Sequence, residues 1–179
     1  ILPFIEANFN VSNKPEGRAY GGFSMGGMTG GYVMRKYFTT FGYYAFCSGN
    51  PSLTAADYDR FAEEAGAKVP FVFLGNGVFE GNLNSQNAIR DNFRTRGIPS
   101  ETAQVRGAHD MMTAGMLFTI FAREYLWKPY SPKLDVTTNA NMIKKGDYFD
   151  ISVSFDKETA TNAISLVLNY DQDKFEYAG

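Results

Sequence analysis

The segment Gly22-Phe23-Ser24-Met25-Gly26 constrains the fold of this chain more than any other. It matches the pattern G-x-S-x-G, in which the chain turns sharply from a strand into a helix and holds the serine in a strained backbone conformation. A strand-like stretch at 18–21 precedes it, and a helix-like stretch at 27–37 follows it. This context predicts a nucleophile elbow, with Ser24 lifted clear of the sheet and the amide of Met25 directed at the place where an oxyanion would form.

The pattern alone is a weak signal, because the chain contains 18 glycines and such short patterns also arise by chance. Two further glycines, Gly21 and Gly27, flank the segment, as close packing of a strand on a helix would require. We expect Gly22 and Gly26 to be the positions at which no side chain fits. The alternative is a glycine-rich surface turn in which Ser24 has no catalytic role.

Composition limits the classes of function. The chain has 179 residues, 44% of them hydrophobic, and a formal charge of -2, so its charge indicates neither a nucleic acid nor an anionic membrane as partner. The single cysteine, Cys47, rules out an internal disulfide, and no apolar run approaches the roughly 20 residues of a membrane span. The chain starts without Met and without a signal peptide, so we expect an internal fragment of a longer protein.

Apolar runs alternate with helix-periodic segments over residues 1–127. The patterns predict strands at 18–21, 41–49, 69–75 and 101–106, and helices at 2–8, 27–37, 54–66, 85–96 and 111–127. Strands that alternate with helices form a parallel sheet with helices on both faces. The predicted class of this part is therefore α/β, with the alternating run at 101–106 lying toward an edge of the sheet.

The composition changes at residues 129–133, where two prolines indicate a stiff linker. Beyond it, residues 134–138, 149–155 and 163–170 alternate at period two and predict strands of an all-β sandwich. About 45 residues are too few to close a sandwich, which needs about 100. The predicted organisation is a domain at 1–128, a linker at 129–133 and a partial β-sandwich module at 134–179.

A serine nucleophile needs a base, and His109 is the only histidine in the chain. It follows the last strand of the predicted sheet, at the end where open α/β sheets place their sites; a purely structural histidine is the alternative. The third group should be a carboxylate after the preceding strand, and Glu80 is the only acid in that segment, 74–81. Asp110 is expected to point away from the ring. The remaining candidates lie on predicted helices and are expected on solvated faces: Asp57, Asp59, Glu63, Glu64 and Asp91.

Three segments together resemble the carbohydrate esterases of the α/β-hydrolase fold, which include feruloyl and acetylxylan esterases: residues 2–6, 21–29 and 107–110. The resemblance covers roughly residues 1–127 and implies the C-terminal half of that fold. It implies hydrolysis of feruloyl or acetyl esters on xylan through an acyl-enzyme at Ser24, with His109 as base and with no metal or cofactor. The family usually carries an aspartate three residues after a strand-ending glycine. Counting from Gly75 this position is Val78, and counting from Gly77 it is Glu80.

An α/β-hydrolase takes its second oxyanion donor from a loop well before the elbow. That loop would precede residue 1, so we expect weak activity, or none, and poor solubility from these residues alone.

The tail is similar to the start of a cohesin module. The residues that carry this resemblance are Gly146-Asp147 with Val153, and the segment 170–177, which reads YDQDKFEY. It implies a secreted bacterial component of a complex that degrades plant cell walls, joined to dockerin-bearing partners.

Two other functions stay open. One is a non-catalytic protein of the same fold that binds carbohydrate because its acid no longer orients His109; the other is a different serine hydrolase, such as a lipase, peptidase or thioesterase. Four aromatic residues near strand ends are candidates either to stack on a sugar or a feruloyl ring or to fill the core: Tyr43, Tyr44, Phe46 and Phe79.

Overall fold

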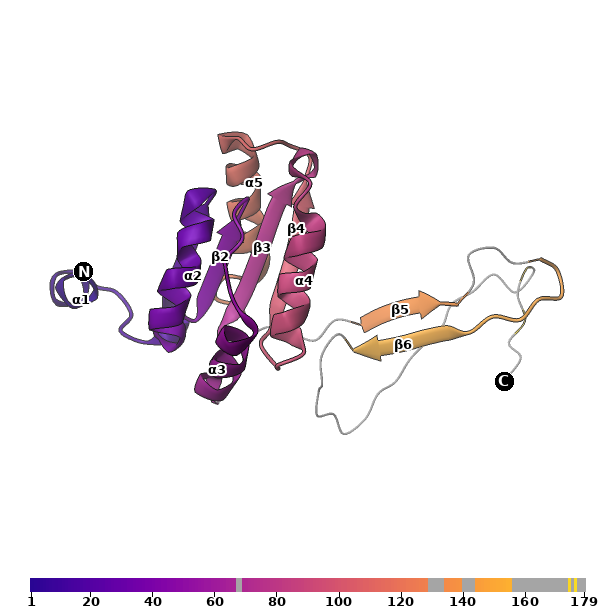
Figure 1. The fold of residues 1–179 in the computed structure, drawn as a ribbon, viewed down its shortest axis with the longest axis horizontal. Helices are drawn as coiled ribbons and strands as arrows, with labels where there is room; N and C mark the ends of the chain where they lie inside the picture. The colour runs from indigo at the N-terminus through magenta and orange to yellow at the C-terminus, as the bar shows by residue number, and fades with distance from the viewer. Residues whose placement is uncertain (67–68, 129–133, 140–143, 156–173, 175, 177–179) are drawn as a thin grey trace. The chain divides into compact units, whose positions relative to one another are not determined.

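The computed structural model describes residues 1–66, 69–128, 134–139, 144–155, 174 and 176 (Figure 1). The chain divides into two compact units, residues 1–133 and 134–179, which are described here one at a time. The predicted linker, 129–133, lies outside the described residues. No helix in the described part of the chain is long and apolar enough to cross a membrane.

The first unit is built on a parallel sheet of four strands in the order β1-β2-β3-β4 (Figure 1). The strands are β1 (Ala19–Phe23), β2 (Tyr43–Cys47), β3 (Phe71–Gly77) and β4 (Ser100–Val105). Each overlaps a predicted strand, and β4 lies at an edge of this sheet, as predicted. Strand β3 runs to Gly77 rather than ending at Gly75, because Asn76 and Gly77 continue the pairing with Gln104 and Val105.

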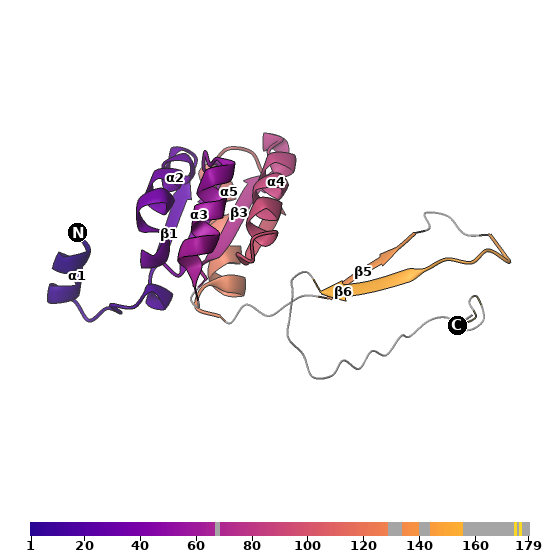
Figure 2. The same cartoon turned by 60° about the horizontal axis from the view of Figure 1, so that its bottom comes forward.

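Helices cover both faces of this sheet (Figures 1 and 2). The elements are α2 (Met25–Tyr37), α3 (Ala55–Ala65), α4 (Leu83–Arg94) and α5 (Met111–Ile120). The side chains of β2 alternate: Tyr44 and Phe46 pack with residues from α2, α3 and α4, whereas Ala45 and Cys47 pack with residues from α5. The first unit is therefore a three-layer α/β structure with α5 on the second face, followed there by residues 121–125.

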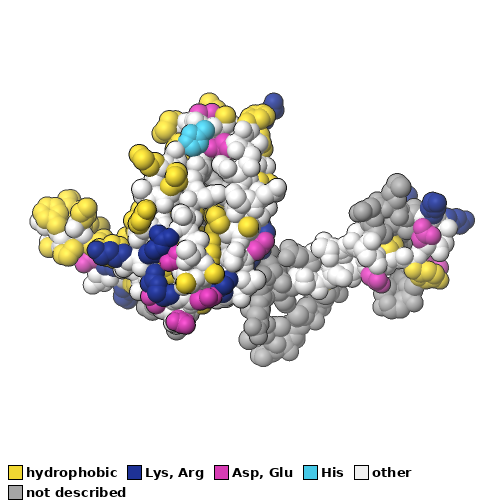
Figure 3. Space-filling view, viewed as in Figure 1, with side chains coloured by type: hydrophobic (Ala, Val, Ile, Leu, Met, Phe, Trp, Pro, Cys, Tyr) yellow, Lys and Arg dark blue, Asp and Glu magenta, His cyan; other side chains and the backbone are white. Residues whose placement is uncertain are grey.

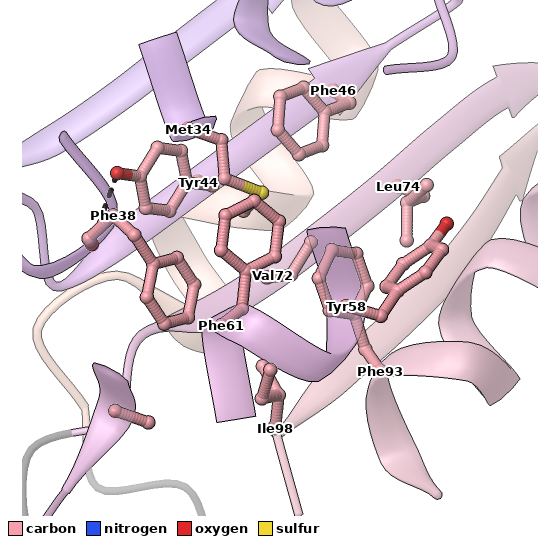
Figure 4. Close-up of a cluster of buried hydrophobic side chains, with 11 residues drawn as sticks. Met34, Phe38, Tyr44, Phe46, Tyr58, Phe61, Val72, Leu74, Phe93 and Ile98 are labelled. Carbon is pink, nitrogen blue, oxygen red and sulfur yellow. Dashed lines mark hydrogen bonds between the residues drawn. The ribbon is translucent and has the colours of Figure 1, made fainter. Parts of the chain in front are cut away.

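The larger of the two buried clusters is mainly aromatic (Figure 4). Phe38 stacks on Phe61 with ring centroids 4.5 Å apart, and Tyr58 meets the ring of Phe93 edge-on at 4.9 Å. Tyr44 and Phe46, which were candidates to stack on a substrate, are fully buried in this cluster. These two rings therefore belong to the core.

Local signals explain where several helices begin and end. Thr54 and Asp57 form a capping box at the start of α3, and Gly66 follows its last turn with a φ of 52°. Asp57 also pairs with Arg35, and its side chain is only 13% exposed, so it does not lie on a solvated face as predicted. The first helix, α1 (Leu2–Asn8), forms where it was predicted and has no buried residue.

The predicted helix at 111–127 does not run through as one α-helix. Helix α5 ends at Ile120, and a π-helical turn, η4, follows at Phe121–Tyr125. The ring of Tyr125 stacks on Phe71 with centroids 4.8 Å apart, and Phe121 is buried against Phe73. Because these rings pack against the strands, the wider turn follows from tertiary contacts rather than from helix periodicity.

In the second unit, β5 (Leu134–Thr138) pairs antiparallel with β6 (Ile151–Phe155). Both strands were predicted, and Val136 lies opposite Val153 in their register. The third predicted strand, 163–170, lies outside the described residues. The β-sandwich and its resemblance to a cohesin stay predictions.

Candidate active site

The candidate residues meet at the carboxyl ends of the strands. Ser24 follows β1, Glu80 closes a short 3-10 turn, η3 (Val78–Glu80), after β3, and His109 lies four residues beyond the end of β4. Because all four strands are parallel, these segments emerge at the same edge of the sheet. Figure 3 shows the imidazole at the surface of this edge, with a carboxylate side chain beside it and apolar side chains around it.

Ser24 has the backbone conformation of a nucleophile elbow, with φ 55° and ψ -119°. Its amide donates to the carbonyl of Cys47 (2.8 Å), and its carbonyl accepts from the amide of Met28 (3.1 Å). A Cβ on Gly22 would lie 2.3 Å from the backbone of Gly26, so Gly22 is required, as predicted. A Cβ on Gly26 would meet no atom within 4 Å, so the same prediction for Gly26 is wrong.

Met25 is the first residue of α2, directly after the candidate nucleophile. The first amides of a helix have no acceptor within it, and the helix dipole makes this end favourable for a negative charge. The amide of Met25 is thus free to receive an oxyanion formed at Ser24. The role of Met25 as an oxyanion donor stays a prediction.

The structure brings Ser24, His109 and Glu80 into one hydrogen-bonded chain. His109 Nε2 lies 2.6 Å from Ser24 Oγ, and His109 Nδ1 lies 2.6 Å from Glu80 Oε1. An ionised carboxylate only accepts hydrogen bonds, so Nδ1 carries a proton that it donates to Glu80. In the neutral imidazole Nε2 is then unprotonated and accepts from the hydroxyl of Ser24. This tautomer is the one that a general base for Ser24 requires.

Glu80 is held in place from the side that faces the protein. Its side chain is only 4% exposed, its Oε2 accepts from Ser48 Oγ (2.7 Å), and it also accepts from the amide of Gly77. Burial acts to raise the pKa of this carboxyl. The hydrogen bonds from Gly77, His109 and Ser48 outweigh burial and hold the pKa of Glu80 below its usual value. The group is therefore a carboxylate at neutral pH.

The unusual position of the acid follows from the length of β3. Because the strand continues to Gly77, Glu80 stands three residues after the glycine that ends it. Val78, at the position counted from Gly75, is exposed and carries no carboxylate. The glutamate therefore occupies the place at the strand end where the acid was expected.

Among the residues that the structure describes, the ring of His109 has one aromatic neighbour, and its other side is open. Phe23, the residue before the nucleophile, stacks on it with centroids 4.9 Å apart and an interplanar angle of 29°. The His109 side chain is 51% exposed, so a substrate can reach it. Asp110 turns away from the ring and caps α5 by accepting from the amide of Thr113 (2.8 Å).

Other candidate chemistry is not supported at this edge. Cys47 is fully buried, and burial raises the pKa of its thiol to about 12, so it is no nucleophile. Within the described ranges, no group of three or more His, Cys, Asp or Glu side chains could hold a metal ion. Of the four candidate aromatic residues, Phe79 is the exposed one, and it lies beside Glu80 in η3.

Sequence reasoning missed Ser48, which follows β2 and contacts Glu80 Oε2. A serine after an apolar strand is a common turn residue, so its type carried no signal. Its place did carry one, because it lies at the carboxyl end of the strand between those that precede Ser24 and Glu80.

Neither a protein-family model nor a curated protein matches the chain. Among solved structures, it is similar to S-formylglutathione hydrolase (FrmB) from Staphylococcus aureus, at 15% identity and a TM-score of 0.55, over 71% of this chain and 57% of that one. It is also similar to the serine hydrolase FphF from the same organism, at 14% identity and a TM-score of 0.55, over 72% of this chain and 61% of that one. A third similar structure is a mutant feruloyl esterase module from Clostridium thermocellum, complexed with sinapinate. Its identity is 18% and its TM-score 0.51, over 67% of this chain and 52% of that one.

This chain therefore spans between 52% and 61% of the length of these three proteins. At such identities the likeness concerns the fold. Together with the four-stranded parallel sheet and the elbow at Ser24, it shows that the first unit has an α/β fold similar to that of these hydrolases.

Proposed function

We propose that the first unit carries the catalytic triad of a serine carboxylesterase. The observation that carries this proposal is the continuous hydrogen-bonded chain from Ser24 Oγ through the imidazole of His109 to Glu80 Oε1, with 2.6 Å at each step. A serine, a base within hydrogen-bonding reach and a carboxylate that fixes the tautomer of the base are the parts that acyl transfer needs.

The reaction follows from these positions. Ser24 Oγ attacks the carbonyl carbon of the ester while its proton passes to His109 Nε2. The negative charge moves to the carbonyl oxygen, next to the amide of Met25. When this intermediate collapses, His109 returns the proton to the departing alcohol, and an acyl-enzyme remains on Ser24. Water, deprotonated by His109, then releases the acid and restores the serine.

For the substrate we propose esters of plant cell wall polysaccharide, feruloyl or acetyl groups on xylan. Two observations support an acyl group with an apolar or aromatic part. The feruloyl esterase module among the similar structures was solved with sinapinate. In addition, five large apolar side chains near the elbow, beside Glu80 and just after His109 are more than half exposed: Met25, Met28, Phe79, Met111 and Met112.

The position of Glu80 argues against the non-catalytic alternative. A degenerate acid would leave His109 Nδ1 without a carboxylate partner, yet Glu80 Oε1 lies within 2.6 Å of it. A thioesterase stays the second candidate, because the same triad cleaves thioesters and one similar structure is an S-formylglutathione hydrolase.

The test is hydrolysis of p-nitrophenyl acetate, methyl ferulate, feruloylated xylan and an S-acyl thioester by the full-length protein and by its Ser24→Ala variant. A matched control is Ser100→Ala, which removes a buried serine hydroxyl at the opposite end of the sheet. We expect Ser24→Ala to lower kcat by at least about 10³-fold while Ser100→Ala leaves it unchanged. The proposal would be refuted if the wild-type protein hydrolysed these substrates no faster than its Ser24→Ala variant. Preference for the thioester would favour the second candidate.

For the second unit we keep the proposal that it is a cohesin-like module that binds dockerin-bearing proteins, and that the protein acts outside the cell. The support is the sequence resemblance together with the antiparallel pair β5 and β6. Isothermal titration of the protein with a dockerin tests the partner. If no heat of binding were measured, the cohesin-like proposal for the second unit would be refuted, and the proposed triad of the first unit would be unaffected.

A further inference from the structure

Ser48 has an unusual backbone for a residue that ends a strand. Its φ is 51°, and among the described residues only Ser24, Ser48 and Trp127 are non-glycine residues with positive φ. Such a conformation persists where the surrounding contacts require it, and it occurs often at functional sites. Ser48 is also buried, with 5% of its surface exposed.

Buried polar contacts fix Ser48 to β3. Its amide donates to the carbonyl of Gly75 (2.7 Å), and the same carbonyl accepts from the side-chain amide of Gln86 on α4 (3.1 Å). Gln86 has no exposed surface. The backbone of Ser48 is therefore held firmly, and its hydroxyl has a defined direction, 2.7 Å from Glu80 Oε2.

A glutamate in the triad needs such a contact more than an aspartate would. Its side chain has one more rotatable bond, so its carboxylate is more free to turn away from the imidazole. Here Oε2 accepts from two directions, the amide of Gly77 and the hydroxyl of Ser48. With Oε2 held, Oε1 is the oxygen that faces His109 Nδ1.

We propose that Ser48 is a positioning residue of the active site: its hydroxyl holds Glu80 Oε2 so that Oε1 faces His109. The role rests on the proposed esterase function, since it acts through the triad acid and does not touch the substrate. The competing account is structural, in which the hydroxyl only satisfies its own need for a hydrogen bond.

Three variants separate the two accounts. Ser48→Ala removes the hydroxyl and keeps the backbone strain of a non-glycine residue at positive φ, whereas Ser48→Gly removes the hydroxyl and relieves that strain. Ser100→Ala is the matched control, because Ser100 is fully buried and its hydroxyl donates to the carbonyl of Arg90 (3.0 Å), far from the triad. We expect both Ser48 variants to lower kcat about 10- to 100-fold, with KM within about twofold, because a hydrogen bond to a charged group is lost.

Ser48→Gly should unfold at a higher urea concentration than Ser48→Ala, because glycine adopts a positive φ without strain. Its kcat should nevertheless be as low as that of Ser48→Ala, which would show that the loss of kcat comes from the missing hydroxyl and not from backbone strain. In a Glu80→Ala background, Ser48→Ala should cause no further loss of kcat, since no carboxylate is left to hold. Ser48 variants with the kcat of Ser100→Ala, or additive losses in the double variant, would overturn the proposal.

A readout independent of turnover keeps this test apart from that of the esterase function. His109 is the only histidine, so the proton on its Nδ1 gives one assignable NMR signal. We expect Ser48→Ala to shift this signal, because Oε1 moves relative to Nδ1, and Ser100→Ala to leave it in place. An unchanged signal in Ser48→Ala would overturn the positioning role even in a protein that cleaves no ester.

Discussion

Replacing Glu80 with glutamine tests the tautomer on which the triad depends. The carboxylate accepts at both oxygens: from His109 at Oε1, and from Ser48 and Gly77 at Oε2. Glutamine has nearly the same shape but presents one oxygen and one NH₂ group. The amide of Gly77 cannot turn away, so we expect the glutamine oxygen to face it. The NH₂ group then faces His109 Nδ1.

This arrangement forces the imidazole into the wrong tautomer. Nδ1 must accept from the NH₂ group, so the ring proton moves to Nε2 and points at Ser24 Oγ, 2.6 Å away. The serine then has no base. The loss of kcat expected for a forced wrong tautomer is about 10³- to 10⁴-fold, equivalent to about 4–5.5 kcal/mol in the activation free energy.

The assay is steady-state hydrolysis of methyl ferulate together with ¹⁵N NMR of the single histidine, in which Nδ1 and Nε2 report the tautomer directly. Glu80→Ala is the comparison, because it removes the carboxylate without imposing either tautomer. We expect Glu80→Gln to be as slow as Glu80→Ala or slower, with the ring proton on Nε2. A glutamine variant within about tenfold of wild type, with the proton still on Nδ1, would refute this reasoning.

Three further predictions concern stability, the imidazole and pH. Gly22→Ala should lower the free energy of unfolding by about 1–3 kcal/mol, because the new Cβ would lie 2.3 Å from the backbone of Gly26. Gly26→Ala, where a Cβ meets no atom within 4 Å, should change it by less than about 0.5 kcal/mol, and urea titration of both variants checks this. Phe23→Leu should lower kcat about three- to tenfold at little cost in stability, because the stacking on His109 is lost; equal kcat would show that the ring is held without it. Hydrogen bonds hold the folded pKa of Glu80 below its ordinary value, so its stabilising contribution is complete above the ordinary pKa and is lost as the pH falls through the folded pKa. The difference in unfolding free energy between wild type and Glu80→Gln should therefore narrow only in acid, and a difference that narrows toward alkaline pH would contradict this.

Sequence patterns predicted much of the first unit because its signals are local. The glycines around Ser24 and the residues at the two ends of α3, Thr54 and Gly66, each mark a boundary that depends on neighbouring residues. The end of β3 was predicted two residues too early, at Gly75 instead of Gly77. Parallel strands then bring the segments with Ser24, Glu80 and His109 to one edge, so order along the chain was enough to propose that they meet.

The features that sequence patterns missed depend on contacts between distant segments. The π-helical turn at 121–125 forms because its rings pack on β3, and helix periodicity does not encode that contact. Tyr44 and Phe46 are core residues because helices cover their face of the sheet. The role of Ser48 depends on a side chain 32 positions away. In each case the residue type was compatible with several environments.

The central claim is that Ser24 forms a covalent acyl-enzyme. The most direct measurement is mass spectrometry of the protein quenched during turnover of p-nitrophenyl acetate, followed by peptide mapping of the acylated residue. The account predicts an acetyl group on Ser24 that forms in the protein and in Ser100→Ala but not in Ser24→Ala, and that accumulates as a burst. Ester turnover without acylation of Ser24, or acylation at another residue that persists in Ser24→Ala, would contradict it.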